Sequence, residues 1–425
     1  MDIEQTKLAV CGGEPVLRSA LARYNGIAQE EIQAVTRVLE SGMLSAFLGT
    51  AGDGFLGGPV VRGLEDAWCE RFEVRHAISM NSATSGLFAA MGAIGIGAQD
   101  EVIVPPYTMS ATVMAPLLYG GIPIFADIEP DTFCIDPESV RSKIGPRTKA
   151  IIAVNLFGHA SRLTELKDIA RRHGLFLIED NAQSPLASEN GTYCGTIGDI
   201  GVFSLNYHKH IHSGEGGLCV TNDDRLAQRL QLIRNHGENA VAAMEVEDIA
   251  NIVGFNYRMT EVGAAIALEQ LKKIEALVER SERLATKLSE LVRGLDGITP
   301  PHVREGCRHV YYVWAARLDE RALGITREQF SRALAAEGFP HALGYVAPLY
   351  WLPLFQRRLA FSSHPFHLSQ VCYPRGLCPV AERMYLKELM TFNITLYDLD
   401  PPTLELLAQA IRKVHRHRAE LARER

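Results

Sequence analysis

The stretch Gly201–Gly217, GVFSLNYHKHIHSGEGG, decides how the rest of the chain is interpreted. It begins with an apolar run typical of a buried strand and then becomes a polar loop that carries one lysine, Lys209, between two histidines. The glycine-rich end lets the backbone turn tightly into a second apolar strand at Leu218–Val220. We therefore expect Lys209 to follow the end of a strand in a crowded loop, where a lysine is poorly solvated.

A lysine amine that is removed from water loses its proton more readily, because burial disfavours its charged form. A neutral amine is nucleophilic and can bond to a carbonyl carbon. Most loop lysines are ordinary solvated charges, so the neighbours of Lys209 decide between the two interpretations. His208, His210 and His212 either move protons or bind an anion of the substrate, or they only cap the loop.

The composition indicates a globular enzyme of two domains. The chain has 425 residues, of which 47% are hydrophobic and 22% charged, and a formal net charge of −7. This length exceeds that of most single cores, and this charge provides no basic face for nucleic acid. Eight scattered cysteines form no CxxC pair, and no apolar run is long enough to span a bilayer. We predict a cytoplasmic protein that has no metal site and binds neither nucleic acid nor membrane.

Short apolar strands alternate with helical segments in the first half of the chain. This alternation is typical of an α/β fold with a mostly parallel central sheet and helices on both faces. Ligands of such sheets bind at the carboxyl ends of the strands. The strands are expected at His76–Met80, Glu101–Val104, Pro123–Ala126, Ala150–Val154, Phe176–Ile178 and Ile200–Leu205, and the helices at 87–94, 111–119 and 164–173.

The flanking sequence suggests an arm and a smaller domain. Residues 1–25 form the expected N-terminal arm, in which glycine and proline prevent regular structure, and residues 26–270 form the large domain. Residues 271–425 form a smaller α+β domain, joined to the first by a long helix from about Thr260 to Leu295. Its expected elements are a strand at Val310–Ala316 and helices at Arg327–Glu337 and 402–415. The apolar, glycine-rich loop Leu44–Pro59 is long enough to suggest a function.

Polar clusters end three of the predicted strands, at Ser82–Ser85, Glu179–Gln183 and Tyr207–Lys209. The first stands at a strand-to-helix turn, where free N–H groups and the helix dipole favour a phosphate group, although serine and threonine are also common helix caps. Asp180 follows an apolar strand and suits pairing with a protonated ring nitrogen, although it could also be a turn residue. Pyridoxal 5′-phosphate needs a lysine amine, an acid beside its ring nitrogen and an anion site for its phosphate. Lys209, Asp180 and the turn at Ser82–Ser85 could provide these three groups.

Seven segments also carry a family resemblance. In order and spacing they resemble the DegT/DnrJ/StrS family of sugar aminotransferases, which are pyridoxal-phosphate-dependent transferases of fold type I. The resemblance is strong from Gly26 to Leu271 and loose beyond. The segments are SATSGLFAA, DEVIVPPYTMSAT, DIEPDTFCIDP, RTKAIIAVNLFGH, IEDNAQS, GDIGVFSLNYHKHIHSGEGG and GFNYRMTEVGAAIALEQL.

The resemblance implies a role for each candidate residue. Lys209 would bond covalently to the cofactor, and the large domain would hold it. Asn256 would reach the phosphate from the neighbouring subunit, so a homodimer would be the smallest active unit. The other contacts would be Ala83, Thr84 and Ser204 at the phosphate, Asp180 at the ring nitrogen, Gln183 at the phenolic oxygen and Met109 against the ring face.

Four features depart from the family pattern. Ala83 stands where glycine is more common, and Asn181 where a small apolar residue is usual. Met109 replaces an aromatic residue that stacks on the cofactor ring; its sulfur can still contact the ring, and Tyr107 is a second candidate. The loop Ala46–Gly58 is longer than in most members, and it lies where the family contacts substrate.

We therefore predict an aminotransferase that moves an amino group from glutamate or glutamine to a keto sugar, nucleotide-linked, or to a keto cyclitol, in a biosynthetic pathway of secondary metabolism. The opening LAVCGGEPVLRS is more similar to the cyclitol enzymes. Two alternatives remain open. Some relatives are dehydratases that replace the lysine by histidine, and a regulator could keep the fold without turnover. Lys209 in its expected place favours transamination.

Overall fold

The computed structural model describes residues 3–361, 366 and 369–423. Its centre is a seven-stranded sheet in the order β1-β9-β8-β5-β4-β2-β3. The strand β9 (Gly217–Thr221) is antiparallel to its two neighbours, and the other six strands share one direction. This confirms the predicted α/β fold with a mostly parallel sheet. The six strands are β1 (His76–Met80), β2 (Glu101–Val104), β3 (Ile122–Phe125), β4 (Thr148–Val154), β5 (Phe176–Asp180) and β8 (Ile200–Ser204).

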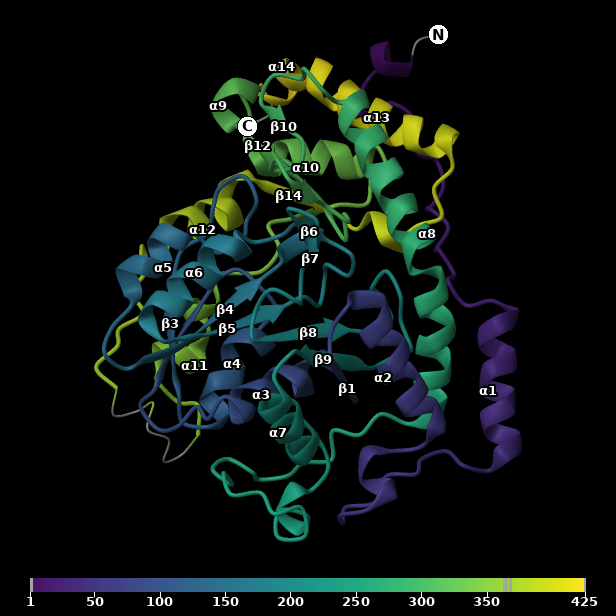
Figure 1. The fold of residues 1–425 in the computed structure, drawn as a ribbon. Helices are drawn as coiled ribbons and strands as arrows, with labels where there is room; N and C mark the ends of the chain where they lie inside the picture. The colour runs from purple at the N-terminus through teal and green to yellow at the C-terminus, as the bar shows by residue number, and fades with distance from the viewer. Residues whose placement is uncertain (1–2, 362–365, 367–368, 424–425) are drawn as a thin grey trace.

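Helices cover both faces of this sheet, which explains why its strands are apolar throughout rather than alternating. On β2, for example, Val102 and Val104 pack into one core while Ile103 packs into the other. The first core includes α3 (Ala83–Ala93), α4 (Ala111–Leu118) and α7 (Asp224–Arg234). The second includes α2 (Pro59–Phe72) and α6 (Leu163–His173). Figure 1 shows α3, α4 and α7 on one side of the sheet and α5 (Pro137–Lys143) and α6 on the other.

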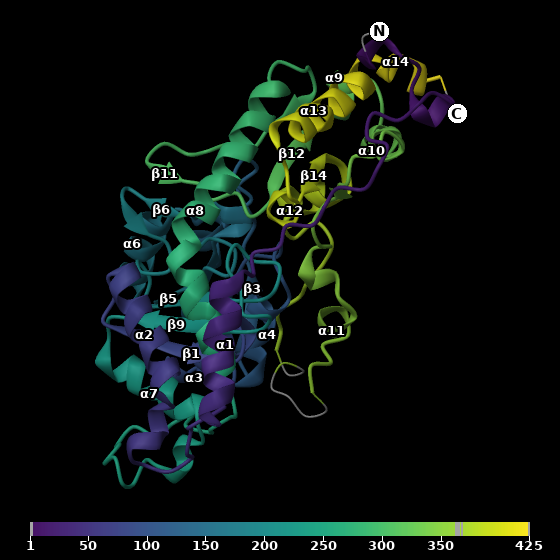
Figure 2. The ribbon, with the colours of Figure 1, turned by 90° about the vertical axis from the view of Figure 1, so that its right-hand side faces the viewer.

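The helix α8 (Glu261–Leu291) runs from the sheet to the C-terminal part of the chain (Figures 1 and 2). Its 31 residues correspond to about 46 Å. The first turns, as far as Val278, pack into the second core, and the turns from Ala285 pack into a third core. The helix α1 (Gln29–Ser41) lies against it, and the buried carboxylate of Glu31 on α1 pairs with Lys273 at 2.8 Å.

The third core lies between a four-stranded antiparallel sheet and two helices. The strand order is β10-β12-β14-β13, with β10 at Ile298–Thr299, β12 at Trp314–Leu318, β14 at Leu389–Phe392 and β13 at Ala342–Leu343. The helices α10 (Arg327–Ala336) and α13 (Pro401–Arg416) cover it. A third, small sheet joins β11 (Cys307–Arg308) to β6 (Ser188–Glu189) and β7 (Thr192–Tyr193). The remaining short helices are α9 (Glu320–Leu323), α11 (Pro353–Gln356), α12 (Pro379–Arg383) and α14 (Arg418–Leu421).

Several boundaries differ from the sequence predictions. The expected strand Val310–Ala316 begins only at Trp314, because Val310 and Val313 donate their backbone N–H groups to the loop after β4 instead. Helix α5 and strand β14 were not predicted, and the loop Leu44–Pro59 contains a 3₁₀ turn at Asp53–Leu56.

The N-terminal arm lies along the C-terminal part (Figure 2). The prediction that it lacks regular structure was wrong in detail, because Ile3–Gln5 and Ala9–Cys11 form 3₁₀ turns. The fully buried carboxylate of Glu337 accepts the backbone N–H groups of Ala9 and Val16, at 2.9 and 3.0 Å, and pairs with the fully buried Lys413 at 3.0 Å. One carboxylate therefore fastens the arm to two C-terminal helices.

Replacing Glu337 by Gln should release the arm. The Lys413 ammonium would then be buried without a countercharge, which typically costs about 3 kcal/mol or more. We expect a lower thermal midpoint and faster amide hydrogen exchange between residues 8 and 17. Glu40→Gln, at an exposed position of α1, is the control and should change neither. Equal stability of the two variants would show that the Glu337–Lys413 pair does not hold the arm in place.

Candidate functional site

The three polar clusters predicted from sequence meet at one cavity of about 180 Å³. It lies where β5 and β8 end, at the carboxyl edge of the sheet, where ligands of α/β proteins bind. Seven of the eight candidate residues line it, and Asn256 does not. The lining includes Ser82, Ala83, Thr84, Met109, Asp180, Gln183, Ser204, His208, Lys209, Glu215 and Tyr345.

Lys209 lies in the loop between β8 and β9. Its backbone N–H donates to the carbonyl of Asn206 at 2.9 Å, and its Nζ lies 4.4 Å from the ring centroid of Tyr312. Burial lowers the pKa of Lys209 to about 8, and the nearby carboxylate of Asp180 partly opposes this shift. A larger share of this amine is therefore neutral at physiological pH than in an ordinary lysine.

Asp180 is the last residue of β5 and is only 4% exposed. Its Oδ2 accepts the hydroxyl of Thr112 at 2.7 Å, and its Oδ1 accepts the backbone N–H of Ala182 at 3.2 Å. Burial raises the pKa of Asp180, whereas these two hydrogen bonds and Lys209 lower it, because they stabilise the carboxylate. Sequence reasoning missed Thr112, although its place after β2, at the same edge of the sheet, was a usable signal.

Gln183 is held at both ends of its amide. Its Oε1 accepts the backbone N–H of Phe157 at 2.8 Å, and its Nε2 donates to the hydroxyl of Tyr345 at 3.0 Å. Burial raises the pKa of Tyr345 to about 12, so its hydroxyl keeps its proton. Tyr345 comes from the chain just after β13, and nothing in the sequence near it pointed to this cavity.

The opposite wall is the N-terminus of α3. Ser82 caps the helix by accepting the N–H of Ser85 at 3.0 Å. The N–H groups of Ala83 and Thr84 have no acceptor within the helix, because they belong to its first turn. A Cβ added to Gly217 on β9 would lie 2.6 Å from the nitrogen of Ala83. Glycine is therefore required there for the strand to approach the helix start so closely.

Two candidate residues lie at or beyond the edge of the cavity. Met109 is 51% exposed, and its Sδ accepts the N–H of Ala111 at 3.0 Å, so its side chain lies at the open side. Tyr107 is fully buried and does not line the cavity. Asn256 is exposed, and its Oδ1 accepts from Arg258 at 2.9 Å, so within one chain it does not contact the other candidates.

The three histidines of the lysine loop differ in position. His208 lines the cavity, and burial together with the Lys209 charge lowers its pKa to about 4. His210 is buried beneath the loop, with Nε2 at 2.8 Å from the carbonyl oxygen of Val310, and burial lowers its pKa to about 4. His212 lies farther along, where burial lowers its pKa and Glu31 opposes the shift. Of the three, His208 lines the cavity that contains Asp180 and the start of α3.

Asn181, which departs from the family pattern, has a structural explanation. It is fully buried, accepts from Asn155 at 2.9 Å and donates to the carbonyl of Cys194 at 3.0 Å. Both ends of its amide are therefore satisfied away from the cavity.

The fold and the cavity together define a class of protein. A partly desolvated lysine, a buried carboxylate and a helix start with free N–H groups surround one cavity at the carboxyl edge of a mostly parallel sheet. This donor set fits pyridoxal 5′-phosphate, which needs an amine, a partner for its ring nitrogen and an anion site. The fold and the cavity are thus those of a pyridoxal-phosphate-dependent enzyme with the fold-type-I architecture.

The chain belongs to the DegT/DnrJ/EryC1/StrS aminotransferase family, whose sequence model matches residues 25–390. It is 34% identical to the L-glutamine:2-deoxy-scyllo-inosose aminotransferase of Streptomyces kanamyceticus over 99% of this chain and 100% of that protein. It is 38% identical to GDP-perosamine synthase of Caulobacter vibrioides over 64% of this chain and 73% of that protein. The crystal structure of DesI in the presence of its TDP-sugar product superposes with a TM-score of 0.81 and 28% identity, covering 98% of each chain.

Two kinds of feature are absent from the described residues. No helix between residues 3 and 423, in the part that the structure describes, is long and apolar enough to cross a membrane. Within the same residues, no group of three or more histidine, cysteine, aspartate or glutamate side chains is placed to hold a metal ion.

Replacing Thr112 by Val should weaken cofactor binding. The change keeps the shape of the side chain but removes the hydroxyl that stabilises the Asp180 carboxylate, a charged hydrogen bond whose loss should raise the dissociation constant for pyridoxal 5′-phosphate roughly tenfold. Spectroscopic titration of the apoprotein measures this constant. Thr112→Ser retains the hydroxyl and should bind almost normally. If Val and Ser variants bind alike, the hydroxyl is irrelevant to the site.

Proposed function

We propose that the protein transfers an amino group from glutamine or glutamate to a keto cyclitol and that Lys209 is the residue that carries the cofactor. The observation that supports this most directly is the position of Lys209, whose amine shares one cavity with Asp180 and the start of α3. The large domain, residues 26–270, supplies all these groups. Residues 271–425 form the smaller domain in this proposal, and they add Tyr345.

Each lining residue has a contact that suits one part of the cofactor. The N–H groups of Ala83 and Thr84 and the hydroxyl of Ser204 would hold the phosphate. Asp180 would pair with the ring nitrogen, and Gln183 would donate to the phenolic oxygen. Met109 would lie against the exposed ring face through its sulfur. When bound, pyridoxal 5′-phosphate supplies the aldehyde that accepts the amino group and a ring that withdraws electrons from the donor.

Lys209 performs the proton transfers in this proposal. With a pKa of about 8, the Lys209 amine is neutral in roughly a tenth of the molecules at pH 7. For a lysine in water this fraction is negligible. A neutral amine can bond to the aldehyde carbon and, once released, can accept the proton from the α-carbon of the amino donor. The nearby Asp180 carboxylate favours the ammonium form that this proton uptake produces.

Two observations favour a cyclitol as acceptor over a nucleotide sugar. A relative that aligns over 99% of this chain is named as an L-glutamine:2-deoxy-scyllo-inosose aminotransferase. Lys209 is also the single Lys or Arg side chain among the described residues that line the cavity. A diphosphate would normally be met by several such cations. A keto sugar linked to a nucleotide is the second candidate, supported by the names of GDP-perosamine synthase and DesI.

The remaining alternatives predict different behaviour. A dehydratase of this fold would eliminate water instead of transferring nitrogen, and a regulator would bind the cofactor without turnover. The presence of Lys209 in the cavity supports transamination over the dehydratase, whose relatives carry a histidine instead. The response of the spectrum to amino donors distinguishes the regulator.

The purified protein loaded with pyridoxal 5′-phosphate should aminate 2-deoxy-scyllo-inosose or scyllo-inosose with glutamine or glutamate. Mass spectrometry of the derivatised amine measures the product, and the near-visible absorbance of the loaded protein should bleach when the donor is added. Lys209→Ala should lower the rate by roughly 10²- to 10⁴-fold, because the proton acceptor is lost.

The acceptor panel should include a TDP-linked and a GDP-linked keto sugar. Amination of these, and not of the cyclitols, would replace the proposed substrate by the second candidate. An unchanged spectrum with every donor would support a regulator, and a full rate in Lys209→Ala would refute the assignment of this lysine.

We further propose that the active unit is a homodimer in which Asn256 completes the site of the neighbouring subunit. Asn256 is exposed and lies outside the cavity of its own chain. The chain also exposes large apolar side chains, as expected where an interface between subunits buries part of the surface. They include Ile32, Leu39, Met43, Leu44, Leu48, Met109, Tyr207 and Val253.

We also propose a cytoplasmic location. The eight free cysteines agree with a reducing compartment.

Mixing two inactive variants tests the shared site. If Asn256 acts in the neighbouring subunit, a dimer of one Lys209→Ala chain and one Asn256→Ala chain contains one intact site. Unfolding and refolding an equal mixture should therefore recover about a quarter of the wild-type activity. Each variant refolded alone gives the baseline. Recovery no higher than the sum of the baselines would show that Asn256 does not act across the dimer.

A further inference from the structure

We propose that Tyr312 is a positioning residue that holds the amine of Lys209 against the face of its ring. This inference rests on the proposed function of Lys209. The Nζ atom lies 4.4 Å from the ring centroid, within the range of a cation–π interaction. Tyr312 is 5% exposed, so the contact is shielded from water, where such interactions are strongest.

The chain takes an unusual path to place this ring. Residues Val310–Val313 were expected to start strand β12, but they cross the loop after β4 instead. Val310 donates its N–H to the carbonyl of Gly158 at 2.9 Å, and Val313 donates to the carbonyl of Phe157 at 3.2 Å. The carbonyl of Val310 lies 2.8 Å from Nε2 of His210, next to the lysine. The crossing therefore contacts the lysine loop directly.

The crossing also contains strained backbone. Tyr311 has φ of +49° and Phe157 has φ of +59°, a left-handed conformation that bulky residues rarely adopt and that costs of order 1 kcal/mol or more at each position. A Cβ added to Gly158 would lie 2.6 Å from the nitrogen of Tyr311 and 2.9 Å from that of Tyr312. Such strain persists only where the surrounding contacts impose it, and it clusters at functional sites.

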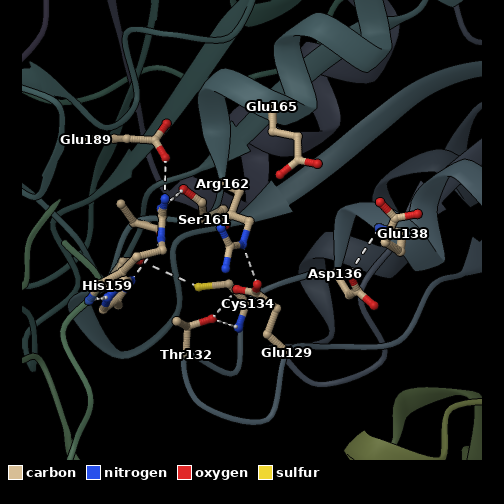
Figure 3. A network of polar contacts seen from close by, with 12 residues as sticks. Glu129, Thr132, Cys134, Asp136, Glu138, His159, Ser161, Arg162, Glu165 and Glu189 are labelled. Carbon is tan, nitrogen blue, oxygen red and sulfur yellow. Dashed lines mark hydrogen bonds and ion pairs between the residues drawn. The ribbon is translucent and has the colours of Figure 1, made fainter. Parts of the chain in front are cut away.

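The segment just before the crossing is anchored to the large domain. Arg304 pairs with the buried carboxylate of Glu189 at 2.6 Å and donates to the carbonyl of Ser161 at 2.9 Å. Its backbone N–H donates to Nε2 of His159 at 3.0 Å. Figure 3 shows Glu189, Ser161 and His159 together on one side of this network. The chain is thus fixed before it reaches Tyr312, and β12 fixes it just afterwards.

The ring opposes part of the effect of burial on Lys209. Burial favours the neutral amine, whereas a ring face favours the ammonium form. The other titratable groups of the cavity are Asp180 on β5, His208 and Glu215 in the loop between β8 and β9, and Tyr345 after β13. His210 lies in the same loop, next to the lysine. Asp180 also favours the ammonium form, and the two histidines are neutral near pH 7. Tyr312 therefore provides both a direction for the free amine and part of its basicity.

The test compares Tyr312→Phe with Tyr312→Leu in the apoprotein. Phe keeps the ring face, whereas Leu keeps an apolar side chain without it. Acetic anhydride reacts with the neutral amine, so the pH dependence of Lys209 acetylation, measured by peptide mass spectrometry, gives its pKa. We expect the wild type and Phe variant to agree and the Leu variant to lie lower by roughly half to one pH unit. Exposed Lys272 provides the internal control.

An equal or higher pKa of Lys209 in the Leu variant would overturn the proposal, because it would show that the ring contributes nothing or only excludes water. Circular dichroism of each variant verifies the fold. If Leu does not fold, Tyr312→Met serves as the second ring-free variant. Borohydride reduction of the cofactor-loaded wild type tests the proposed function separately, since a mass label on another lysine would refute Lys209 as cofactor carrier without changing the apoprotein result.

Discussion

The site depends on keeping one lysine amine away from water. Burial lowers the pKa of Lys209 to about 8, and this cost is tolerated because Asp180 and the ring of Tyr312 lie close to the amine. Without such neighbours a lysine at this depth would turn toward solvent or destabilise the loop. The carboxyl edge of the parallel sheet is where these groups can converge, because β5 and β8 end there side by side.

Two close backbone approaches turn this edge into a cavity. Gly217 lets β9 run against the start of α3, so that the free N–H groups of Ala83 and Thr84 face the end of β8. Gly158 lets the chain before β12 cross the loop after β4 and present Tyr312. In both places a methyl group would collide with backbone atoms, which cannot move aside as a side chain can. The positions of the reacting groups are therefore set by backbone packing.

The sequence predicted the parts of this arrangement that are local. Alternating apolar strands and helices indicated the sheet, and polar residues after the strands indicated Lys209, Asp180 and the start of α3. Tyr312 and Tyr345 were missed because their approach to the site depends on tertiary contacts far along the chain. Thr112 was missed although its place after β2 was a usable signal. Two-residue strands such as β6, β7 and β11 were missed as well, because they are too short to show a periodicity. Val310–Ala316 has the composition of a strand, but contacts with the loop after β4 divert its first residues.

The cavity combines groups from two parts of the chain. The sheet and α3 provide the lysine, the carboxylate and the helix start, whereas the C-terminal part provides Tyr345 to the lining and Tyr312 to the lysine amine. Tyr345 bonds to Gln183, and Gln183 also accepts the N–H of Phe157, the residue whose carbonyl receives Val313. A shift of the C-terminal part relative to the sheet would thus change the ring contact of Lys209 and the orientation of Gln183 together. The packing that joins the two parts therefore also fixes the position of Lys209 relative to the other residues of the site.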